Sequence, residues 1–333
     1  MTGPPISVVI VNWNHGHLLP GCLDALLAQS EGVADLHVVD NGSGDGSAQS
    51  VSSRYPRVHV ACMQRNLGFS AALNWGIKHC AGDLVLSLNP DVIVAPGFLS
   101  GIAGAMAADD RIGIVAPKLL CPGDSRVLDS TGLFIDRRKR PFDRGQGEVD
   151  RGQYDQSLAV FGACGAAALY RRAMLEDVAV DGEVLDEHFF AYYEDADLSW
   201  RAQLRGWRSV FAPQAEASHD RGWGDRLRGV GRAAKSSSGP RLALRNRYLM
   251  TAKNDRVTDF LVDLPLILAS ELPRLAYAAV TKPRVLLGLV DLARALPAAL
   301  KKRRTIQARS VDGAQVRSWF LTRRSHESPS HLL

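Results

Sequence analysis

The first 120 residues alternate short β-branched runs with amphipathic stretches, and this alternation most constrains the fold. The run ISVVIVN at 6–12 is apolar throughout, which is typical of a strand buried on both faces of a sheet. Residues 17–29 then repeat apolar side chains at helical spacing. Further strand-like runs lie at 36–40, 58–63, 84–89 and 112–120, with helix-like stretches at 69–80 and after Pro96. The pattern predicts an α/β fold with a mostly parallel sheet flanked by helices.

Polar residues gather where these predicted strands end. Asp40 and Asn41 open the turn NGSGDGS, and Asn89 and Asp91 follow the strand-like run at 84–89. Ligands of open α/β sheets bind beyond the carboxyl ends of the strands, so we expect a binding site there. The alternative for the first loop is an Asx-rich turn that only joins a strand to a helix.

An acidic cluster in FFAYYEDADLSWR, at 189–201, precedes a stretch with helical spacing. Glu194, Asp195 and Asp197 lie at the expected helix start, where the helix dipole favours carboxylates, so simple capping is one interpretation. Like charges beside aromatic side chains also raise a carboxylate's pKa, which favours a catalytic role. Arg201, four residues after Asp197, is expected to pair with it.

Residues 121–158 are polar and rich in Gly, Asp and Arg, and they include the basic run at 137–140. Long excursions of this kind are often functional lids, so we expect a mobile loop. The basic run either contacts an anionic acceptor or is solvated.

Positive charge is concentrated towards the C-terminus. Residues 241–310 hold 14 Lys and Arg against 5 Asp and Glu, whereas the whole chain has a net charge of only +5. This asymmetry suggests contact with an anionic surface. Four prolines are expected to break the apolar helical stretch 257–300 into short pieces, and charges within it argue against a transmembrane span. The region either lies on a membrane surface or packs on the rest of the chain, and the polar tail after 310 is expected to fray.

The overall composition excludes several classes of protein. It is 46% hydrophobic and 23% charged, as in ordinary globular proteins. Five scattered cysteines without a CxxC pair argue against a disulfide framework or zinc cluster and favour a reducing compartment. The N-terminus lacks the basic and apolar regions of a signal peptide. The positive charge lies among apolar helices without interleaved aromatic residues, so we expect no nucleic-acid partner.

The order of the motifs is more specific than any one of them. VVDNGSGDGS is followed by RNLGFSAALNWGI, LSLNPDV, FGACGAAALYRR, FFAYYEDADLSWR and then His219. This succession, over roughly residues 5–250, resembles the family 2 glycosyltransferases of the GT-A fold, and within them the bacterial rhamnosyltransferase-like branch. The resemblance implies a catalytic domain at 1–240. The charge and composition described above predict a basic amphipathic helical region at 241–310 and a polar tail at 311–333.

The resemblance also implies a nucleotide-sugar site. Its expected residues are Val11, Asn12, Asp40, Asn41, Asn66, Gly68, Asn74 and Asn89. Glycine lets the backbone come close to a ligand, and free N–H groups at a helix start bind anions, which suits the turn at 66–68. For Asn66 the alternative is a helix N-cap.

A divalent cation, Mn²⁺ or Mg²⁺, is the implied cofactor, with Asp91 and His219 as its ligands. Asn89 stands where many relatives have an aspartate, so Asp91 is the obvious carboxylate of this motif. Such cations complete their shell with water and diphosphate, and an imidazole ligand favours Mn²⁺.

The paired acids Glu194 and Asp195 match the family's catalytic position, with Asp195 as the general base and Glu194 in support. Direct attack with one base implies inversion. We expect dTDP-L-rhamnose as the first candidate donor, with UDP- and GDP-sugars as alternatives. The expected acceptor is a saccharide or a polyprenyl-diphosphate-linked saccharide of cell-surface polysaccharide synthesis. We therefore expect a cytoplasmic protein, peripheral on the inner face of the cell membrane.

The sequence argues against two other functions. A nucleotidyltransferase would carry a basic residue in a glycine-rich loop after the first strand, but VNWNHGHLL has none. A catalytically degenerate carbohydrate-binding or assembly module would not need Asp40, Asp91, Asp195 and His219 together.

Overall fold

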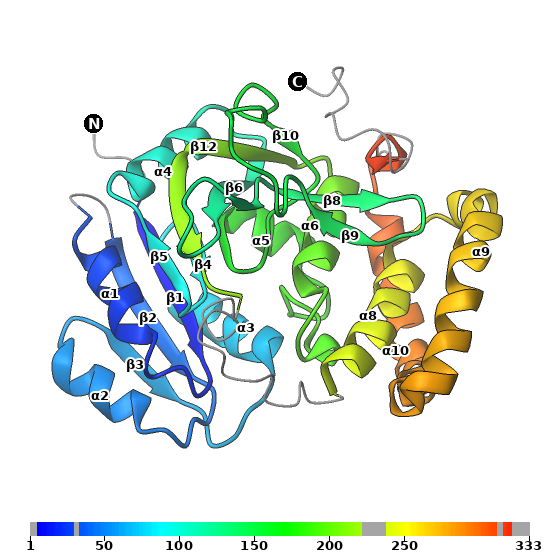
Figure 1. The fold of residues 1–333 in the computed structure, drawn as a ribbon, viewed down its shortest axis with the longest axis horizontal. Coiled ribbons are helices and arrows are strands. Elements are labelled where there is room, and N and C mark those ends of the chain that lie inside the picture. The colour runs from blue at the N-terminus through cyan, green and yellow to red at the C-terminus, as the bar shows by residue number, and fades with distance from the viewer. Residues whose placement is uncertain (1–4, 30–32, 222–237, 312–315, 322–333) are drawn as a thin grey trace.

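The computed structural model describes residues 5–29, 33–221, 238–311 and 316–321. The predicted polar tail therefore lies outside the described residues at 312–315 and from 322 onward, and so do the first four residues of the chain. A twisted sheet forms the centre of the molecule, with helices on both faces and a group of long C-terminal helices at one side (Figure 1).

The strands are β1 (Ile6–Asn12), β2 (Val33–Asp40), β3 (His59–Cys62), β4 (Leu84–Leu88), β5 (Val92–Val94), β6 (Ile112–Leu120), β7 (Leu128–Ser130), β8 (Leu133–Asp136), β9 (Pro141–Asp143), β10 (Ala159–Val160), β11 (Ala167–Arg171), β12 (Arg208–His219) and β13 (Phe320–Leu321). The α-helices are α1 (Leu19–Leu27), α2 (Ser47–Arg54), α3 (Phe69–His79), α4 (Phe98–Ala107), α5 (Arg172–Val178), α6 (Glu194–Leu204), α8 (Ser238–Asn254), α9 (Val257–Thr281) and α10 (Leu287–Ala308). Two 3₁₀ turns complete them, η1 (Glu187–Phe189) and η2 (Pro283–Leu286).

The main sheet has the strand order β10-β12-β6-β11-β4-β1-β2-β3. Strands β3, β2, β1 and β4 are parallel, and so are β6 and β12. Strand β11 runs antiparallel between β4 and β6 and joins the two parallel groups. The predicted α/β class with a mostly parallel sheet is confirmed.

The alternation of side chains along β1 explains why its sequence is apolar throughout. Val8 and Ile10 pack into a core with α1, α2 and α4, whereas Val9 and Val11 pack into a second core with α3, α5 and α6. Successive strand residues point to opposite faces, so a strand covered by helices on both sides has no solvent-facing position.

The segment 121–158 is packed against the body, and the prediction of a mobile loop was wrong. It forms β7, β8 and β9, and the guanidinium of Arg144 is buried, where it donates to the carbonyls of Thr131 and Ser157. Polar residues suggested solvent exposure, but here they are satisfied by partners inside the protein.

The basic run at 137–140 is also engaged by the protein. Arg137 and Lys139 pair with Asp263 of α9, and Arg140 pairs with Glu271 of the same helix. Three of its four side chains therefore fasten the polar segment to α9, which answers the choice between a solvated run and an acceptor contact.

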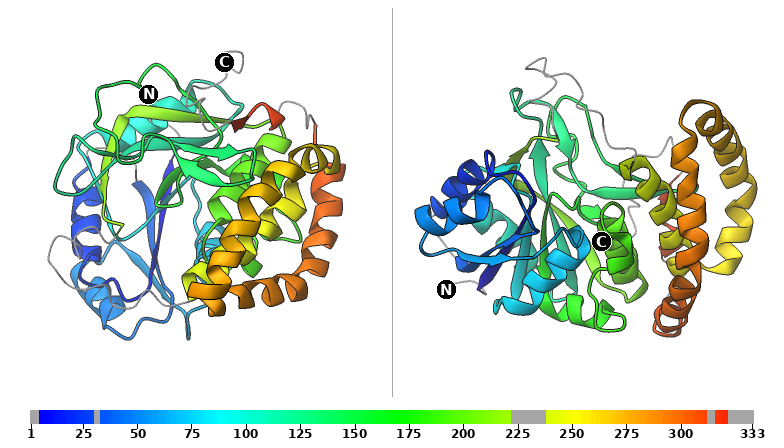
Figure 2. Two further views of the ribbon diagram at one scale, coloured as in Figure 1. Left: turned by 45° about the vertical axis from the view of Figure 1, so that its right-hand side comes forward. Right: turned by 90° about the horizontal axis from the view of Figure 1, so that it is seen from below.

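Helix α9 runs unbroken through Pro265 and Pro273, and α10 runs through Pro297, so the prediction of short pieces was wrong at these prolines. Only Pro283 marks an interruption, at η2. A proline inside a helix costs about 3 kcal/mol, which the tertiary ion pairs of α9 can offset. Helix α10 packs on α8, and α8 contacts α6 (Figure 2). Within the described ranges, no helix has both the length and the apolar character that are needed to cross a bilayer.

Residues 316–321 are docked, so the expectation of a frayed tail was wrong for this part. Strand β13 pairs in parallel with β8, and Val316, Trp319 and Phe320 are buried. The Trp319 ring meets Phe161 edge-on with a centroid separation of 6.3 Å. Aromatic burial here outweighs the polar character of the surrounding sequence.

Candidate active site

The loop after β2 is held by the side chain of Asn12 at the end of β1. Asn12 Nδ2 donates to Asp40 Oδ1 at 2.9 Å and to Ser47 Oγ at 2.8 Å. The backbone N–H of Ser43 donates to Asp40 Oδ2 at 3.0 Å. Asn12 and Asp40 thus shape the loop, and the carboxylate keeps acceptor capacity because two oxygens offer about four lone-pair sites.

A second loop, at the start of α3, is joined to the first by Asn41. Asn41 Nδ2 donates to Asn66 Oδ1 at 3.0 Å and to the Gly68 carbonyl at 3.1 Å. Gly68 has φ of +90°, and a Cβ atom there would lie 2.6 Å from the Phe190 carbonyl oxygen. Gly68 therefore permits the loop around Phe190 to close over the start of α3.

Other predicted nucleotide residues lie apart from these two loops or point elsewhere. Asn74 donates to the Leu185 carbonyl at 2.8 Å and accepts from the Leu185 N–H at 2.9 Å, so its amide anchors the loop before η1. Val11 is buried in β1. Asn89 follows β4, and its backbone N–H donates to the Ala166 carbonyl at 2.8 Å.

Asp91 and His219 are 128 positions apart in sequence but adjacent in space. Antiparallel pairing of β5 with β12 places His219 opposite Val92, and the N–H of Asp220 donates to the Asp91 carbonyl. His219 Nε2 lies 3.6 Å from Asp91 Oδ2. Ligand bonds of about 2.1 Å place neighbouring ligand atoms about 3 Å apart, so this spacing suits two ligands of one cation.

The orientation of His219 is set by Asp129 of β7. His219 Nδ1 lies 2.7 Å from Asp129 Oδ2, and an ionised carboxylate accepts only, so Nδ1 carries the proton. The Nε2 atom then faces Asp91. Burial acts to raise the pKa of Asp129, but the hydrogen bond from His219 and the charge of Arg221 hold that pKa below its usual value. Metal-binding histidines commonly have such a carboxylate partner.

The surroundings of the Asp91 carboxylate favour a bound cation. Its Oδ1 atom is buried and finds no hydrogen-bond partner among the described residues. Burial raises the pKa of Asp91, while His219 acts in the opposite direction. A buried acceptor without a donor costs free energy, which a bound cation would remove. These residues therefore fit a divalent cation.

Arg221 connects this acidic group to the predicted base. Its guanidinium pairs with Asp129 at 2.9 Å and with Asp143 at 2.7 Å, and it lies 3.3 Å from Cys164 Sγ. The neighbouring N–H of Gly165 donates to Asp195 Oδ2 at 2.9 Å. The chain FGACG therefore brings Asp195 to the same region as the Asp91 and His219 pair.

Asp195 and Glu194 begin α6 in different surroundings. Burial raises the pKa of Asp195, and the N–H groups of Gly165 and Ala196 act to lower it. Burial and the charge of Asp195 raise the pKa of Glu194 to about 8. Oε2 of Glu194 is buried without a partner among the described residues. At neutral pH, Glu194 is thus mainly protonated and Asp195 is the acid suited to ionise.

The loop that leads into α6 is strained and is held by α8. Phe190, Tyr192 and Tyr193 have φ of +63°, +75° and +72°, which residues other than glycine rarely adopt. Asn246 of α8 is buried, and its Nδ2 donates to the carbonyls of Phe189, Ala191 and Tyr192 at 2.8–2.9 Å. A C-terminal helix therefore fixes the backbone that carries Glu194 and Asp195.

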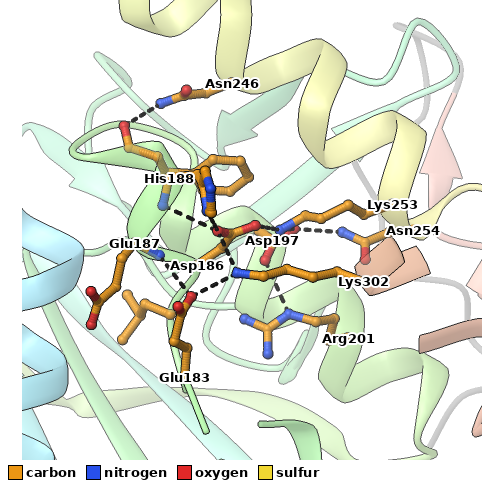
Figure 3. Close-up of polar contacts among 12 residues, drawn as sticks. Glu183, Asp186, Glu187, His188, Asp197, Arg201, Asn246, Lys253, Asn254 and Lys302 are labelled. Atoms are coloured by element: carbon orange, nitrogen blue, oxygen red, sulfur yellow. Dashed lines mark hydrogen bonds and ion pairs between the residues drawn. The ribbon is translucent and has the colours of Figure 1, made fainter. Parts of the chain in front are cut away.

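A buried ionic network joins α8 and α10 to α6 and to the segment before it (Figure 3). Lys253 pairs with Asp186 at 2.5 Å and with Asp197 at 3.0 Å, and Lys302 pairs with Asp186 at 2.8 Å and with Glu183 at 2.7 Å. Glu183, Asp186 and His188 have ligand atoms close enough to hold a metal ion, but two lysine ammonium groups already bind these carboxylates. The network is therefore structural.

The predicted pairing of Asp197 with Arg201 is confirmed, with Arg201 Nε 3.0 Å from Asp197 Oδ2. Asp129, Arg221 and Asn246 were missed by sequence reasoning. Arg221 lies two residues after His219, and that proximity was the only signal in the sequence for any of them. Asp129 and Asn246 sit in segments without a motif, so only tertiary contacts reveal them.

Two relatives with named activities share sequence with this chain. N-acetylglucosaminyl-diphospho-decaprenol L-rhamnosyltransferase of Mycobacterium tuberculosis is 29% identical over 249 residues, covering 64% of this chain and 75% of that protein. An N-acetylglucosaminyltransferase of Mesorhizobium japonicum is 26% identical over 230 residues, covering 65% of this chain and 51% of that protein. The chain thus spans about half the length of this second relative.

Two solved structures share the fold. A mannosyltransferase of Pyrobaculum calidifontis, solved with GDP-Man and Mn²⁺, superposes with a TM-score of 0.54 at 17% identity, covering 95% of this chain and 86% of that one. GalNAc-T7, solved with UDP, GalNAc and Mn²⁺, gives a TM-score of 0.54 at 14% identity, covering 65% of this chain and 43% of that one.

The family model for Glycosyl transferase family 2 matches residues 7–179, just over half of the chain. This span includes the loops at 40–47 and 66–68 and the Asp91 strand end, whereas the paired acids and His219 follow it. With the GT-A architecture and the rhamnosyltransferase relative, these observations identify the chain as a member of glycosyl transferase family 2, a nucleotide-sugar-dependent glycosyltransferase of the rhamnosyltransferase-like kind.

Proposed function

We propose that this protein is an inverting, cation-dependent transferase that moves L-rhamnose from dTDP-L-rhamnose to a lipid-linked saccharide. The observation that carries the proposal is the convergence of Asp91, His219 and Asp195 around Arg221 and Gly165. The rhamnosyltransferase relative supports the sugar, and UDP- and GDP-sugars are the alternative donors.

The nucleotide-sugar donor would bind at the carboxyl ends of β1, β2 and β4. The loop built by Asn12, Asp40 and Asn41 would receive the nucleoside, with the residual acceptor capacity of Asp40 directed to its N–H or hydroxyl groups. Asn66 and Gly68, at the start of α3, would lie next to the donor because Asn41 joins the two loops. Helix N–H groups favour anions there.

Asp91 and His219 would hold the divalent cation. When bound, Mn²⁺ or Mg²⁺ supplies positive charge against the negative charge that develops on the diphosphate leaving group. Asp129 would keep His219 in the tautomer whose Nε2 can bind the metal. The fold shared with two structures that contain Mn²⁺ supports this cofactor.

Asp195 would accept the proton of the acceptor hydroxyl as that oxygen attacks the sugar. Its elevated pKa suits a base, and the hydrogen bond from the Gly165 N–H directs one carboxylate oxygen while the other is held by Ala196. Protonated Glu194 would keep a second negative charge away from the base. A single direct displacement inverts the anomeric centre.

The acceptor would be a polyprenyl-diphosphate-linked saccharide in the synthesis of a cell-surface polysaccharide. The decaprenol-linked substrate named for the mycobacterial relative supports this class. Such acceptors remain in the bilayer, so the enzyme would work as a peripheral protein on the inner face of the cell membrane.

The test is sugar transfer to N-acetylglucosaminyl-diphosphodecaprenol with dTDP-L-rhamnose and Mn²⁺, followed by mass spectrometry of the product. Asp195→Asn should lower kcat by about 10²–10⁴-fold, whereas the exposed control Asp110→Asn should match the parent. If the parent releases no nucleotide from dTDP-, UDP- or GDP-sugars, the transferase proposal fails. If Asp195→Asn keeps full activity, the assignment of the base is wrong.

A further inference from the structure

Helix α9 is turned with its acidic side chains inward. Its three acids, Asp259, Asp263 and Glu271, are all buried. Asp263 forms an ion pair with Lys139 at 3.0 Å, and Glu271 pairs with Arg247 of α8. A helix on the surface of a soluble protein usually buries its apolar stripe and exposes its charges, so this arrangement is reversed.

The outward side of α9 is correspondingly apolar. Its large exposed side chains are Val257, Leu261, Val262, Leu266, Leu268, Leu272, Tyr277 and Val280, of which Leu261 is 58% exposed, Leu272 61% and Val280 85%. Leu261, Leu268 and Leu272 recur at helical spacing and thus share one side. Single exposed apolar residues are ordinary, but a continuous stripe along a 25-residue helix marks an interaction surface.

An apolar groove opens beside this stripe, between α8, α9 and α10. Its lining includes Val257, Phe260, Leu292, Leu296 and Leu300. Val257 contributes both to the groove and to the exposed stripe, so hydrocarbon surface continues from one to the other.

The exposed charges of α9, η2 and α10 are all positive. Among described residues 257–308, the exposed ionic side chains are Arg274, Lys282, Arg284, Arg294, Lys301 and Arg304. The acids of this stretch are buried or paired, and Asp291 lies 2.8 Å from Arg241. An apolar stripe bordered by cations complements the interface of an anionic bilayer.

We infer that the outward face of α9, defined by Leu261, Val262, Leu266, Leu268, Leu272, Tyr277 and Val280, docks on a membrane that contains anionic phospholipid. A second copy of the chain is a poorer occupant, because a two-fold interface would set the basic border against itself. This inference rests on the proposed function, since a lipid-linked acceptor is reached at a bilayer. The helix would lie in the interface plane without crossing it.

The attachment of α9 also gives the docked face a physical connection to the site. Glu271 of α9 is bound by Arg247 of α8, and the adjacent Asn246 holds the loop that leads to Asp195. Docking would thus bring the helices that position the base close to the membrane surface, where the acceptor lies.

The test is co-sedimentation of the full chain with vesicles of phosphatidylglycerol and phosphatidylcholine, compared with vesicles of phosphatidylcholine alone. The parent should bind the anionic vesicles, and 0.5 M NaCl should weaken this binding. The variant Leu261→Glu/Leu272→Glu should bind about ten- to a hundredfold more weakly. The matched control is Leu27→Glu/Val149→Glu, which places the same charges at exposed apolar positions outside α9 and should bind like the parent.

Vesicle binding by the parent is scored separately from sugar transfer, so failure of one proposal is distinguishable from failure of the other. Nucleotide release with a water-soluble acceptor should be equal in parent and α9 variant. If the parent ignores anionic vesicles, or if the α9 variant binds them as well as the parent, the inference is overturned. A dimer in gel filtration that the α9 variant dissolves, without vesicle binding, would identify a second copy as the occupant instead.

Discussion

His219 Nδ1 lies 2.7 Å from Oδ2 of Asp129, and this contact determines which imidazole nitrogen is free. Nδ1 donates to Asp129, so Nε2 is the ring nitrogen on the side where Asp91 lies, 3.6 Å away. Asp129 comes from β7, in the segment that its composition had suggested was a mobile loop. Asp129, which belongs to no sequence motif, therefore orients His219, which belongs to the motif succession.

Replacing Asp129 by Asn should weaken Mn²⁺ binding by about 10–100-fold, because the imidazole loses the carboxylate that fixes its tautomer. Isothermal titration of the purified protein with Mn²⁺ measures this directly, without turnover. Asp124→Asn, a partly exposed acid in the same segment, is the control. Equal Mn²⁺ affinity in the parent and Asp129→Asn would contradict this role.

Glu194→Gln should stabilise the protein increasingly as the pH rises from about 4.5 to about 8. The folded-state pKa of Glu194 is raised to about 8, so its protonated form favours folding below pH 4.5, and that contribution is lost as the pH rises through 8. Gln removes the loss, so the difference in unfolding free energy should widen by at most about 1.4 kcal/mol per pH unit. Urea denaturation at several pH values measures the difference, and a constant value from pH 5 to pH 8 would refute this environment for Glu194.

Asn246→Ala should lower kcat per folded molecule while the KM for the donor changes little. The substitution removes three hydrogen bonds from a buried loop with positive φ angles, so unfolding free energy should also fall, by about 2 kcal/mol. Asn246→Asp keeps the shape but removes the N–H donors, and it should show the same change in kcat. Steady-state kinetics normalised by active-site titration separate a positioning effect from loss of folded protein. If kcat is retained in both variants, α8 does not position the base.

Trp319→Ala should destabilise the protein by about 3–5 kcal/mol, because a buried indole leaves a cavity among aromatic rings. Val311→Ala, at an exposed position shortly before it, should change the unfolding free energy by less than about 0.5 kcal/mol. Chemical denaturation of both variants provides the comparison. Similar small effects in the two would show that residues 316–321 are not part of the folded body.

Most of the sequence motifs lie in segments whose secondary structure follows from the local sequence. Strand β1 is recognisable because a buried parallel strand needs apolar residues on both faces. The sequence also indicated Asp40, Asp91 and Asp195 as site candidates, since Asp40 ends a strand, Asp91 follows one and Asp195 lies in the first turn of a helix. What it indicated less well is what each side chain contacts, as Asn74 shows by anchoring Leu185.

Polar composition misled where tertiary partners exist. The basic run at 137–140 has the composition of a solvated loop, yet Lys139 is buried against Asp263, 124 residues later. Pro265 and Pro273 would end an isolated helix, but α9 continues because its acids are fastened to the body. Such pairings involve distant residues, and local patterns carry no information about them.

By itself the sequence determined the α/β class, the family and the acids at the strand ends and helix start, because these follow from local periodicity and motif order. Only the tertiary structure decided that Asp129 orients His219, that Asn246 holds the loop before Asp195 and that α9 turns its leucines outward. The physical reason is that burial and pairing depend on which distant segments meet.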